Sequence, residues 1–278
     1  MLGGAPSGRK PSFGLEWPVG LPISPCVTGG LSVTRWRAVR RLLHPRGREE
    51  SGRLIVEGRR AVRTVLTGPL KPEYLLTGPA MATQLEELAE WFGAGDVPVY
   101  NLTATQASEL SDTAHPQELF AVLPWRPATG IPLVLPQLIL HLSGIRNPLN
   151  MGALLRTAAA FGIAVTCSPD CVDVTHPAAV RGGAATYFSL PLNVNMPLSE
   201  LHARCPHRLV YASATGGTDL STWTWPERVI LVMGGEASGA TESIEGATAV
   251  HIPVNVESLN AAVAGGIIMW EAHRGMKT

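Results

Sequence analysis

Cysteines are few in the 278-residue chain, and they are not spaced like metal ligands. The four are Cys26, Cys167, Cys171 and Cys205, and no two of them form a CxxC pair. Zinc sites and disulfide frameworks use paired or regularly spaced cysteines. The pattern therefore argues against a structural metal or a disulfide-rich fold, and it favours ordinary thiols in a reducing compartment.

Long apolar runs are absent as well. No stretch approaches the ~18 consecutive apolar residues of a membrane-spanning helix. The first segment, MLGGAPSGRKPSFGLEWPVG, lacks the continuous apolar core of a secretory signal. It is rich in Gly and Pro rather than amphipathic, although a transit peptide stays an alternative. We therefore expect a cytoplasmic protein, with a disordered leader over residues 1–33.

Lysine is scarce, with 3 residues against 19 arginines, and the net charge is zero. A zero net charge argues against binding to nucleic acid, but the distribution of the charge argues for it. Ten arginines lie between Arg35 and Arg63, opposed by three glutamates, which leaves a local excess of seven positive charges (10 − 3). Such a cluster favours polyanion binding, and a solvated arginine-rich surface is the alternative.

Alternating helix and strand patterns predict an α/β domain over residues 34–124. Its expected helices lie at 34–43, 59–68, 83–93 and 103–112. Its expected strands lie at 53–58, 72–78, 97–103 and 119–125. The proline-rich segment 125–136 is predicted to be a linker.

A second α/β series is predicted over residues 137–278. Strands are expected at 137–145, 163–169, 207–215, 228–233 and 249–254, and helices at 150–162 and 258–274. The segment 176–194 reads as a helix or turn followed by a strand. The apolar runs QLILHL, RLVYA and RVILVM are typical of strands buried on both faces of a parallel sheet.

Three polar loops follow expected strands of the second series, namely SGIRNPLNMG (143–152), MGGEASG (233–239) and IPVNVESLN (252–260). Ligands of open α/β sheets bind beyond the carboxyl ends of the strands, so these loops form the candidate site. MGGEASG lacks the Lys and Ser/Thr of a P-loop, and a tight turn with a solvated Glu236 is its alternative interpretation.

The segment SLNAAVAGGIIMW is predicted to be a helix, with Ser258 as its cap and Asn260 in its first turn. Gly265 and Gly266 each cost this helix about 1 kcal/mol relative to alanine. Small residues kept at such a cost indicate close packing, either within the core or against another chain.

Together these segments resemble, in order, the three motifs of the SpoU/TrmH family of RNA ribose 2′-O-methyltransferases, which belongs to the SPOUT class. The matching stretches are NPLNMGALLRTA followed by FG, LVMGGEASG, and IPVNVESLNAAVAGGIIMWEA. In the first domain, RLLHPRGREESGRLIVEGRRAV and LSDTAHPQELFAVL resemble the L30e-like substrate-binding domain that many members carry. The resemblance covers about residues 34–275, and its third motif is shorter here than in most members.

The resemblance implies an L30e-like α/β domain over residues 34–124 and a SPOUT domain over residues 137–278. The SPOUT domain would have a parallel sheet and a deep trefoil knot. It also implies a homodimer, with S-adenosylmethionine bound in the knot as methyl donor. The implied donor-binding residues are Ala214, Gly234, Gly235, Ile252, Leu259 and Asn260.

The catalytic residues implied by the resemblance are Arg156, Asn150, Glu236, Ser258 and Asn260. We expect RNA contacts from Arg40, Arg41 and Arg59 of the arginine-rich segment and from Arg181, for which a plain helix-surface charge is the alternative. A guanidinium is hardly ever deprotonated in proteins, so it is a poor general base. We therefore expect Arg156 to hold a phosphate and to stabilise the developing alkoxide, with Asn150 and Glu236 orienting it.

The expected function is methylation of a ribose 2′-hydroxyl in RNA, with 23S-type rRNA of the large subunit as substrate and antibiotic resistance as one consequence. Two alternatives stay open. A SPOUT enzyme acting on a small molecule or peptide is compatible with the zero net charge. A non-catalytic RNA-binding module would be expected to have lost Arg156, Glu236 or Asn260, yet all three are present.

Overall fold

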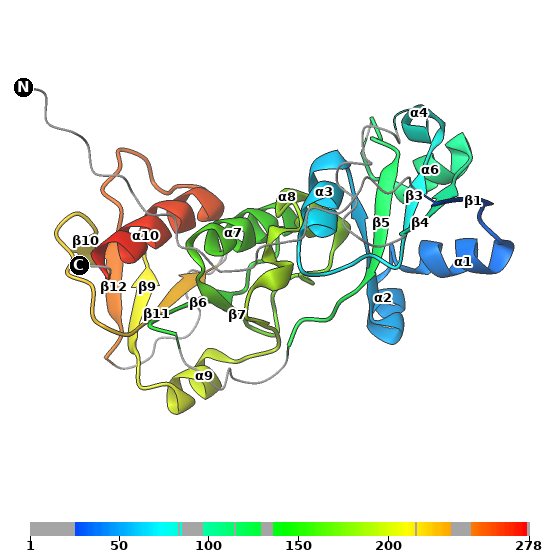
Figure 1. Ribbon diagram of the computed structural model, residues 1–278. Helices are drawn as coiled ribbons and strands as arrows, with labels where there is room; N and C mark the ends of the chain where they lie inside the picture. The colour runs from blue at the N-terminus through cyan, green and yellow to red at the C-terminus, as the bar shows by residue number, and fades with distance from the viewer. Residues whose placement is uncertain are drawn as a thin grey trace, which may run out of the picture.

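The computed structural model describes residues 26–82, 84, 97–113, 115–128, 136–214, 216–234 and 246–276. It contains two β-sheets, one in each of the expected α/β domains (Figure 1). In this part of the chain no helix has the length and apolar character needed to cross a membrane.

The N-terminal domain has a five-stranded mixed sheet in the order β1-β4-β3-β5-β2. The strands are β1 (Cys26–Gly30), β2 (Arg53–Glu57), β3 (Tyr74–Thr77), β4 (Pro98–Asn101) and β5 (Leu119–Pro124). β5 pairs antiparallel with both β2 and β3, while β4 pairs parallel with β1 and β3. The helices are α1 (Val33–Arg41), α2 (Pro45–Ser51), α3 (Arg59–Thr67), α4 (Pro79–Ala82) and α6 (Ala104–Leu110).

The prediction of a disordered leader up to residue 33 is wrong for its last part, because Cys26–Gly30 forms β1. This strand has no alternating pattern of its own. It is ordered by pairing with the edge of β4, where the Thr28 hydroxyl also donates to the Val99 carbonyl at 3.0 Å. Residues 1–25 lie outside the described residues, as does most of the expected helix at 83–93.

The C-terminal domain has a seven-stranded sheet in the order β10-β12-β9-β11-β6-β7-β8. The strands are β6 (Leu138–Ser143), β7 (Ala164–Cys167), β8 (Leu192–Asn193), β9 (Arg208–Ala212), β10 (Thr218–Asp219), β11 (Val229–Gly234) and β12 (Thr248–His251). Every pairing is parallel. The central strands β6 and β11 are almost entirely buried, which confirms the predicted parallel sheet.

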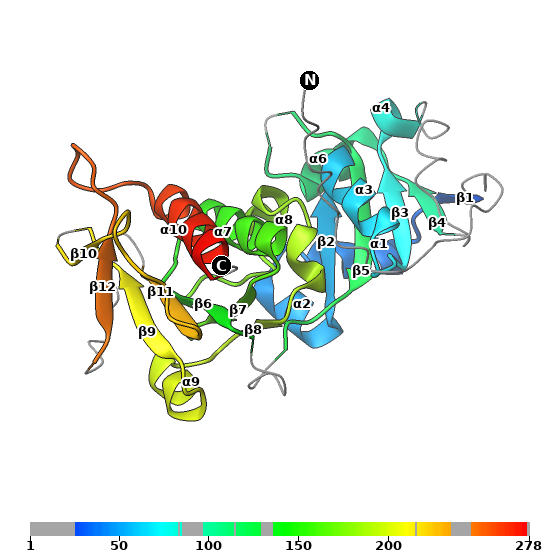
Figure 2. The ribbon, with the colours of Figure 1, turned by 60° about the vertical axis from the view of Figure 1, so that its left-hand side comes forward.

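Helices cover both faces of this sheet (Figures 1 and 2). α7 (Pro148–Phe161) and α10 (Ala261–Gly275) lie side by side on one face, and α9 (Leu198–Arg204) packs on the other. α7 and α10 approach closely at Gly265, where an added Cβ would lie 2.4 Å from a methyl carbon of Leu154. Residues 235–245, which connect β11 to β12, lie outside the described residues, and the trefoil knot stays a prediction.

The two domains contact each other directly through α8 (Pro177–Gly182) and β2. Arg48 of α2 is 4% exposed and reaches across the junction. Its guanidinium donates to the Asp173 carboxylate at 2.6 Å, to the Thr175 hydroxyl at 2.8 Å and to the Leu42 carbonyl at 2.9 Å. One of the ten clustered arginines therefore holds the domains together instead of facing a polyanion.

β5 ends at Pro124 and β6 begins at Leu138, on either side of the expected linker 125–136. Within that linker, the Trp125 indole donates to the Phe188 carbonyl of the second domain at 3.2 Å. Residues 129–135 lie outside the described residues. The domain boundaries, residues 34–124 and 137–278, stay predictions.

Candidate functional site

The loop after β6 begins α7 with a cap from Asn147. Its side-chain oxygen accepts hydrogen bonds from the backbone N–H groups of Leu149 at 2.8 Å and Asn150 at 3.3 Å. Pro148, at the first helical position, has no N–H to leave unpaired. Asn147 therefore carries the capping role, and the Asn150 side chain, whose residue is 9% exposed, is left for other contacts.

The loop after β12 begins α10 with a cap from Asn260, so the prediction that Ser258 caps this helix is wrong. The Asn260 side-chain oxygen accepts from the N–H groups of Ala262 at 3.0 Å and Val263 at 3.3 Å. The helix begins at Ala261, three residues later than the predicted range 258–274, because Asn260 is its cap and has a non-helical backbone.

The starts of these two helices are joined by their asparagines. The Asn260 amide donates to the Asn150 side-chain oxygen at 3.0 Å. Two predicted catalytic residues that are far apart in the sequence therefore lie in direct contact. Their bond sets the position of the first turn of α7 relative to the first turn of α10.

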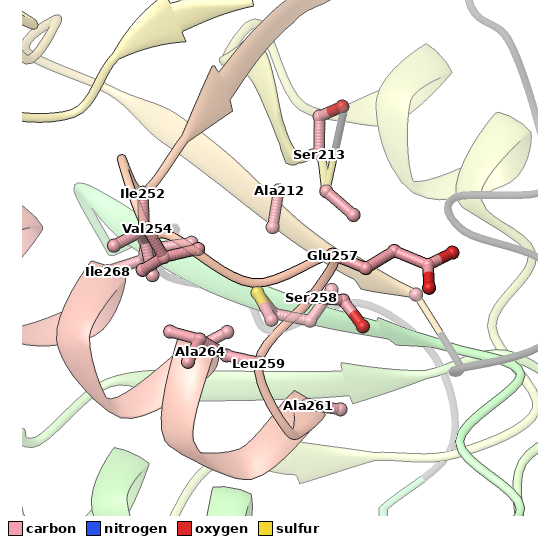
Figure 3. Close-up of a pocket in the computed structure, with 13 residues that line it drawn as sticks. Ala212, Ser213, Ile252, Val254, Glu257, Ser258, Leu259, Ala261, Ala264 and Ile268 are labelled. Carbon is pink, nitrogen blue, oxygen red and sulfur yellow. The ribbon is translucent and has the colours of Figure 1, made fainter. Parts of the chain in front are cut away.

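A cavity of about 190 Å³, here called the strand-end cavity, opens beside the Asn150–Asn260 contact, at the carboxyl ends of β9, β11 and β12 (Figure 3). Four predicted donor-binding residues line it: Ala214, Gly234, Ile252 and Leu259. The predicted catalytic residue Ser258 also lines it. Gly235 and Glu236 lie outside the described residues, and Asn260 does not belong to the described lining.

The cavity has an apolar side and a polar side. Figure 3 shows Ile252, Val254 and Ile268 gathered on one side, and the oxygens of Glu257 and Ser258 on the other. The sequence interpretation did not select Glu257, although its position directly before the SLN segment was a signal that could have found it. The cavity can therefore hold a ligand that combines an apolar body with polar or cationic groups.

Arg156 lies elsewhere, in a second cavity of about 240 Å³ between the two domains, here called the junction cavity. Its lining includes three arginines, Arg60, Arg156 and Arg181, together with His115 and Glu57. Among the described residues, Arg156 makes no hydrogen bond or ion pair. The structure thus brings Arg156 and Arg181 together in the junction cavity. Neither arginine belongs to the described lining of the strand-end cavity.

Arg181 is held by two carboxylates of the N-terminal domain. Its Nη1 donates to Asp112 at 2.5 Å and lies 3.5 Å from Glu57. Burial raises the pKa of Glu57 above its usual value, although a hydrogen bond from Ser111 and the charge of Arg181 act in the opposite direction. Arg181 is therefore an ion-paired side chain at the domain junction, and its contact with RNA stays a prediction.

The other predicted RNA-binding arginines are partly neutralised. Arg40 pairs with Glu109 at 3.2 Å, and Arg41 pairs with Glu50. Both lie on α1, at the end of the molecule away from the C-terminal domain (Figure 1). Arg59, at the start of α3, donates to the Gln84 side chain at 2.6 Å. α1 and α3 pack into different hydrophobic clusters of the N-terminal domain, and RNA binding by these arginines stays a prediction.

The described residues contain no group of three or more His, Cys, Asp or Glu side chains placed to hold a metal ion. Cys167, Cys171 and Cys205 are free thiols.

Comparison with known proteins matches both domains. A sequence model of the SpoU rRNA Methylase family matches residues 137–270, and one of the MRM3-like substrate binding domain matches residues 34–121. The chain is 26% identical over 246 residues to an uncharacterized tRNA/rRNA methyltransferase of Synechocystis, covering 86% of this chain and 90% of that protein.

A second relative is the 23S rRNA (guanosine-2′-O-)-methyltransferase RlmB of Xylella fastidiosa, 35% identical over 146 residues. That match covers 49% of this chain and 58% of RlmB, so it spans about half of this chain and a little more than half of RlmB. The crystal structure of the SpoU methyltransferase AviRb from Streptomyces viridochromogenes, in complex with AdoMet, has the same fold. Its TM-score is 0.73 over 87% of this chain and 98% of AviRb, at 24% identity.

Proposed function

The chain belongs to the SpoU rRNA methylase family through its C-terminal domain, and on this basis we propose that it methylates a ribose 2′-hydroxyl of RNA with S-adenosylmethionine as donor. One observation carries the proposal. Residues at the carboxyl ends of three strands, Ala214 after β9, Gly234 at the end of β11 and Ile252 after β12, converge on one cavity beside the Asn150–Asn260 contact.

The residues of the strand-end cavity fit the proposed donor. Adenine and the methionine chain have apolar surfaces, which the side formed by Ile252, Val254 and Ile268 can enclose. The sulfonium and ammonium groups are cationic, and the Glu257 carboxylate lies on the polar side. When bound, the donor supplies an electrophilic methyl group. AviRb, whose fold this chain shares, was solved with AdoMet bound.

Arg156 is proposed to act on the RNA. A ribose hydroxyl is a very weak acid, so transfer needs the hydroxyl to be positioned and its developing negative charge to be stabilised. A guanidinium can do both, because it binds a phosphate through two parallel hydrogen bonds and stays charged. Asn150 holds the start of α7 against α10, and Arg156 lies further along the same helix.

The substrate is proposed to be rRNA of the large subunit. RlmB is named as a 23S rRNA enzyme, and the N-terminal domain matches a substrate-binding domain. Three arginines line the junction cavity, and a guanidinium can bind a phosphate group. Antibiotic resistance stays a prediction.

A homodimer is proposed through α10. Val263, Ile267 and Trp270 form an apolar stripe on its outer side and are 52%, 38% and 50% exposed. Gly266 lies between them in the sequence, and a Cβ added there would meet nothing within 4 Å. Packing inside one copy therefore does not explain this second glycine. A second copy of the same helix, packed closely across a twofold axis, would explain both the stripe and the glycine.

The deciding experiment is incubation of the protein with methyl-labelled S-adenosylmethionine and, in separate reactions, total rRNA, free nucleosides and a small-molecule extract. Label in rRNA that survives alkaline hydrolysis as a dinucleotide supports 2′-O-methylation, because the methyl group blocks cleavage at that ribose. Label only in the extract would support the alternative of a small-molecule SPOUT enzyme. Donor binding without any transfer would support the non-catalytic alternative.

A further inference from the structure

The domain junction contains an ion-pair network that the proposed reaction does not require. Arg181 of α8 is contacted by Glu57, at the end of β2, and by Asp112, in the segment after α6. The Glu57 side chain is 10% exposed and also accepts a hydrogen bond from the Ser111 hydroxyl. The network therefore has a fixed, largely buried member and, in Asp112, a member whose side chain is 50% exposed.

The carboxylates of Glu57 and Asp112 oppose the positive charge of the junction cavity. Arg60, Arg156 and Arg181 contribute three positive charges to its lining, and Glu57 faces the same space. Glu57 and Asp112 both lie against Arg181, so they cancel the attraction that this arginine would offer to a phosphate group. A carboxylate and a phosphate compete for the same N–H groups of a guanidinium.

Burying Glu57 carries a cost that the fold accepts. A buried carboxylate is stable only when it is paired, and Arg181 is its cationic partner here. Glutamate at this position makes the pairing intramolecular, so Arg181 is occupied before any RNA arrives. A neutral glutamine of the same size would leave the guanidinium open to any polyanion.

We propose that Glu57 and Asp112 are specificity-determining residues that reserve Arg181 for an RNA whose shape brings a phosphate into the junction. RNA that binds only loosely cannot displace the two carboxylates, and it is held less tightly than the three arginines alone would hold it. The proposal rests on the proposed function, since it assumes that RNA is the substrate.

The test compares Asp112→Asn and Glu57→Gln with wild type in equilibrium binding to total rRNA and to a poly(U) oligonucleotide, each over a range of salt concentrations. Asp112→Asn is the primary variant, because the Asp112 side chain is 50% exposed and its replacement leaves no buried charge unpaired. Glu73→Gln is the matched control. It removes one carboxylate from a different Arg–Glu pair of the same domain, Arg53–Glu73 at 2.8 Å.

We expect Asp112→Asn and Glu57→Gln to bind poly(U) about three- to tenfold more tightly than the control, with a smaller gain for rRNA. Their plot of log affinity against log salt should be steeper by about one, because the released Arg181 adds one phosphate contact. The gain should disappear when Arg181→Ala is added, which a merely structural effect of either carboxylate would not do.

Equal affinities and slopes for Asp112→Asn, Glu57→Gln and Glu73→Gln, in a wild-type background that binds and methylates RNA, would overturn this inference alone. A gain that survives Arg181→Ala would also overturn it. If the wild type neither binds nor methylates RNA, the proposed function fails and the inference fails with it.

Discussion

The amide of Asn260 donates to the side-chain oxygen of Asn150 at 3.0 Å, and this contact joins the first turns of α10 and α7. The same Asn260 caps α10 through its own side-chain oxygen. One side chain therefore uses its acceptor to start a helix and its donor to hold a second helix in place. This double use gives a physical reason for asparagine at position 260, because aspartate could cap but could not donate.

Asn260→Asp and Asn260→Ala should separate the two uses. Asp keeps the cap oxygen but loses the bond to Asn150, so it should lower the free energy of unfolding by about 1 kcal/mol. Ala loses the cap as well, for a total of about 2 kcal/mol. Urea unfolding measures both. Asn147→Ala, which removes only the cap of α7, is the control and should cost about 1 kcal/mol. Equal values for Asp and wild type would show that the contact with Asn150 contributes nothing.

Gly152→Ala should be more damaging than Gly265→Ala. A Cβ on Gly152 would lie 2.3 Å from the Ala179 carbonyl oxygen and 2.8 Å from the Gly183 nitrogen, which are backbone atoms of the α8 region. A Cβ on Gly265 would meet the end of the Leu154 side chain, which can turn aside. We expect losses of about 3 and about 1 kcal/mol in urea unfolding. The reverse order would mean that α8 shifts more easily than Leu154 repacks.

The candidate site was more predictable than the charges around it. Gly234, Ile252 and Leu259 were expected to meet because loops at the carboxyl ends of parallel strands share one edge, and they line one cavity. Asn150 and Asn260 were expected in one catalytic group, although not in direct contact. That expectation came from the order of the motifs, which local propensity could not supply.

Long-range pairing explains what could not be predicted. Counting charge treats the ten clustered arginines alike, yet Arg48 is buried against Asp173, 125 residues away in the sequence. Arg181 and Glu57 are 124 residues apart, so no local pattern relates them. β1 has the same explanation, because its order comes from the edge of β4 and not from its own residues.

Arg48→Met should destabilise the protein, and by less in acid. The pKa of the Asp173 carboxyl lies below its usual value of 3.8: burial would raise it, but hydrogen bonds from Thr175 and Arg48 and the charge of Arg48 outweigh this. A lowered folded-state pKa stabilises the fold above the unfolded-state value and loses its effect as pH falls through the folded-state value. We expect a loss of about 2 kcal/mol at pH 7, below the value for a fully buried pair because Asp173 is partly exposed.

The measurement is urea unfolding of wild type and Arg48→Met at several pH values between 7 and 3. The gap in unfolding free energy should be constant down to pH ~4 and should narrow below it. Arg53→Met serves as the control, because it removes the cation of the more exposed Arg53–Glu73 pair. It should lower the free energy of unfolding by less than about 1 kcal/mol. If the difference in unfolding free energy between the two proteins instead grows as the pH falls, Arg48 does not stabilise the ionised form of Asp173.

Arg156→Ala should slow methyl transfer while leaving donor binding intact, because Arg156 does not belong to the described lining of the strand-end cavity. We expect a fall in kcat of about 10²- to 10³-fold. Arg156→Lys keeps the charge but loses the two parallel hydrogen bonds, so its kcat should be intermediate. Calorimetry with S-adenosylmethionine and a methylation assay measure the two effects. Equal loss of donor binding and transfer would contradict the assignment of Arg156 to the RNA.

Trp270→Glu should convert a dimer into a monomer. If α10 packs against α10 of a second copy, the two carboxylates introduced at position 270 would be buried, unpaired and close to each other. Light scattering after gel filtration should give twice 29.5 kDa for wild type and 29.5 kDa for the variant. Val33→Glu, at an apolar residue that is 66% exposed on α1, adds the same charge far from α10 and should stay dimeric. A wild-type mass of one chain at micromolar concentration would refute the dimer.

Because Val254 borders the strand-end cavity and is 42% exposed, loss of the dimer should also weaken donor binding if the partner covers that side of the cavity.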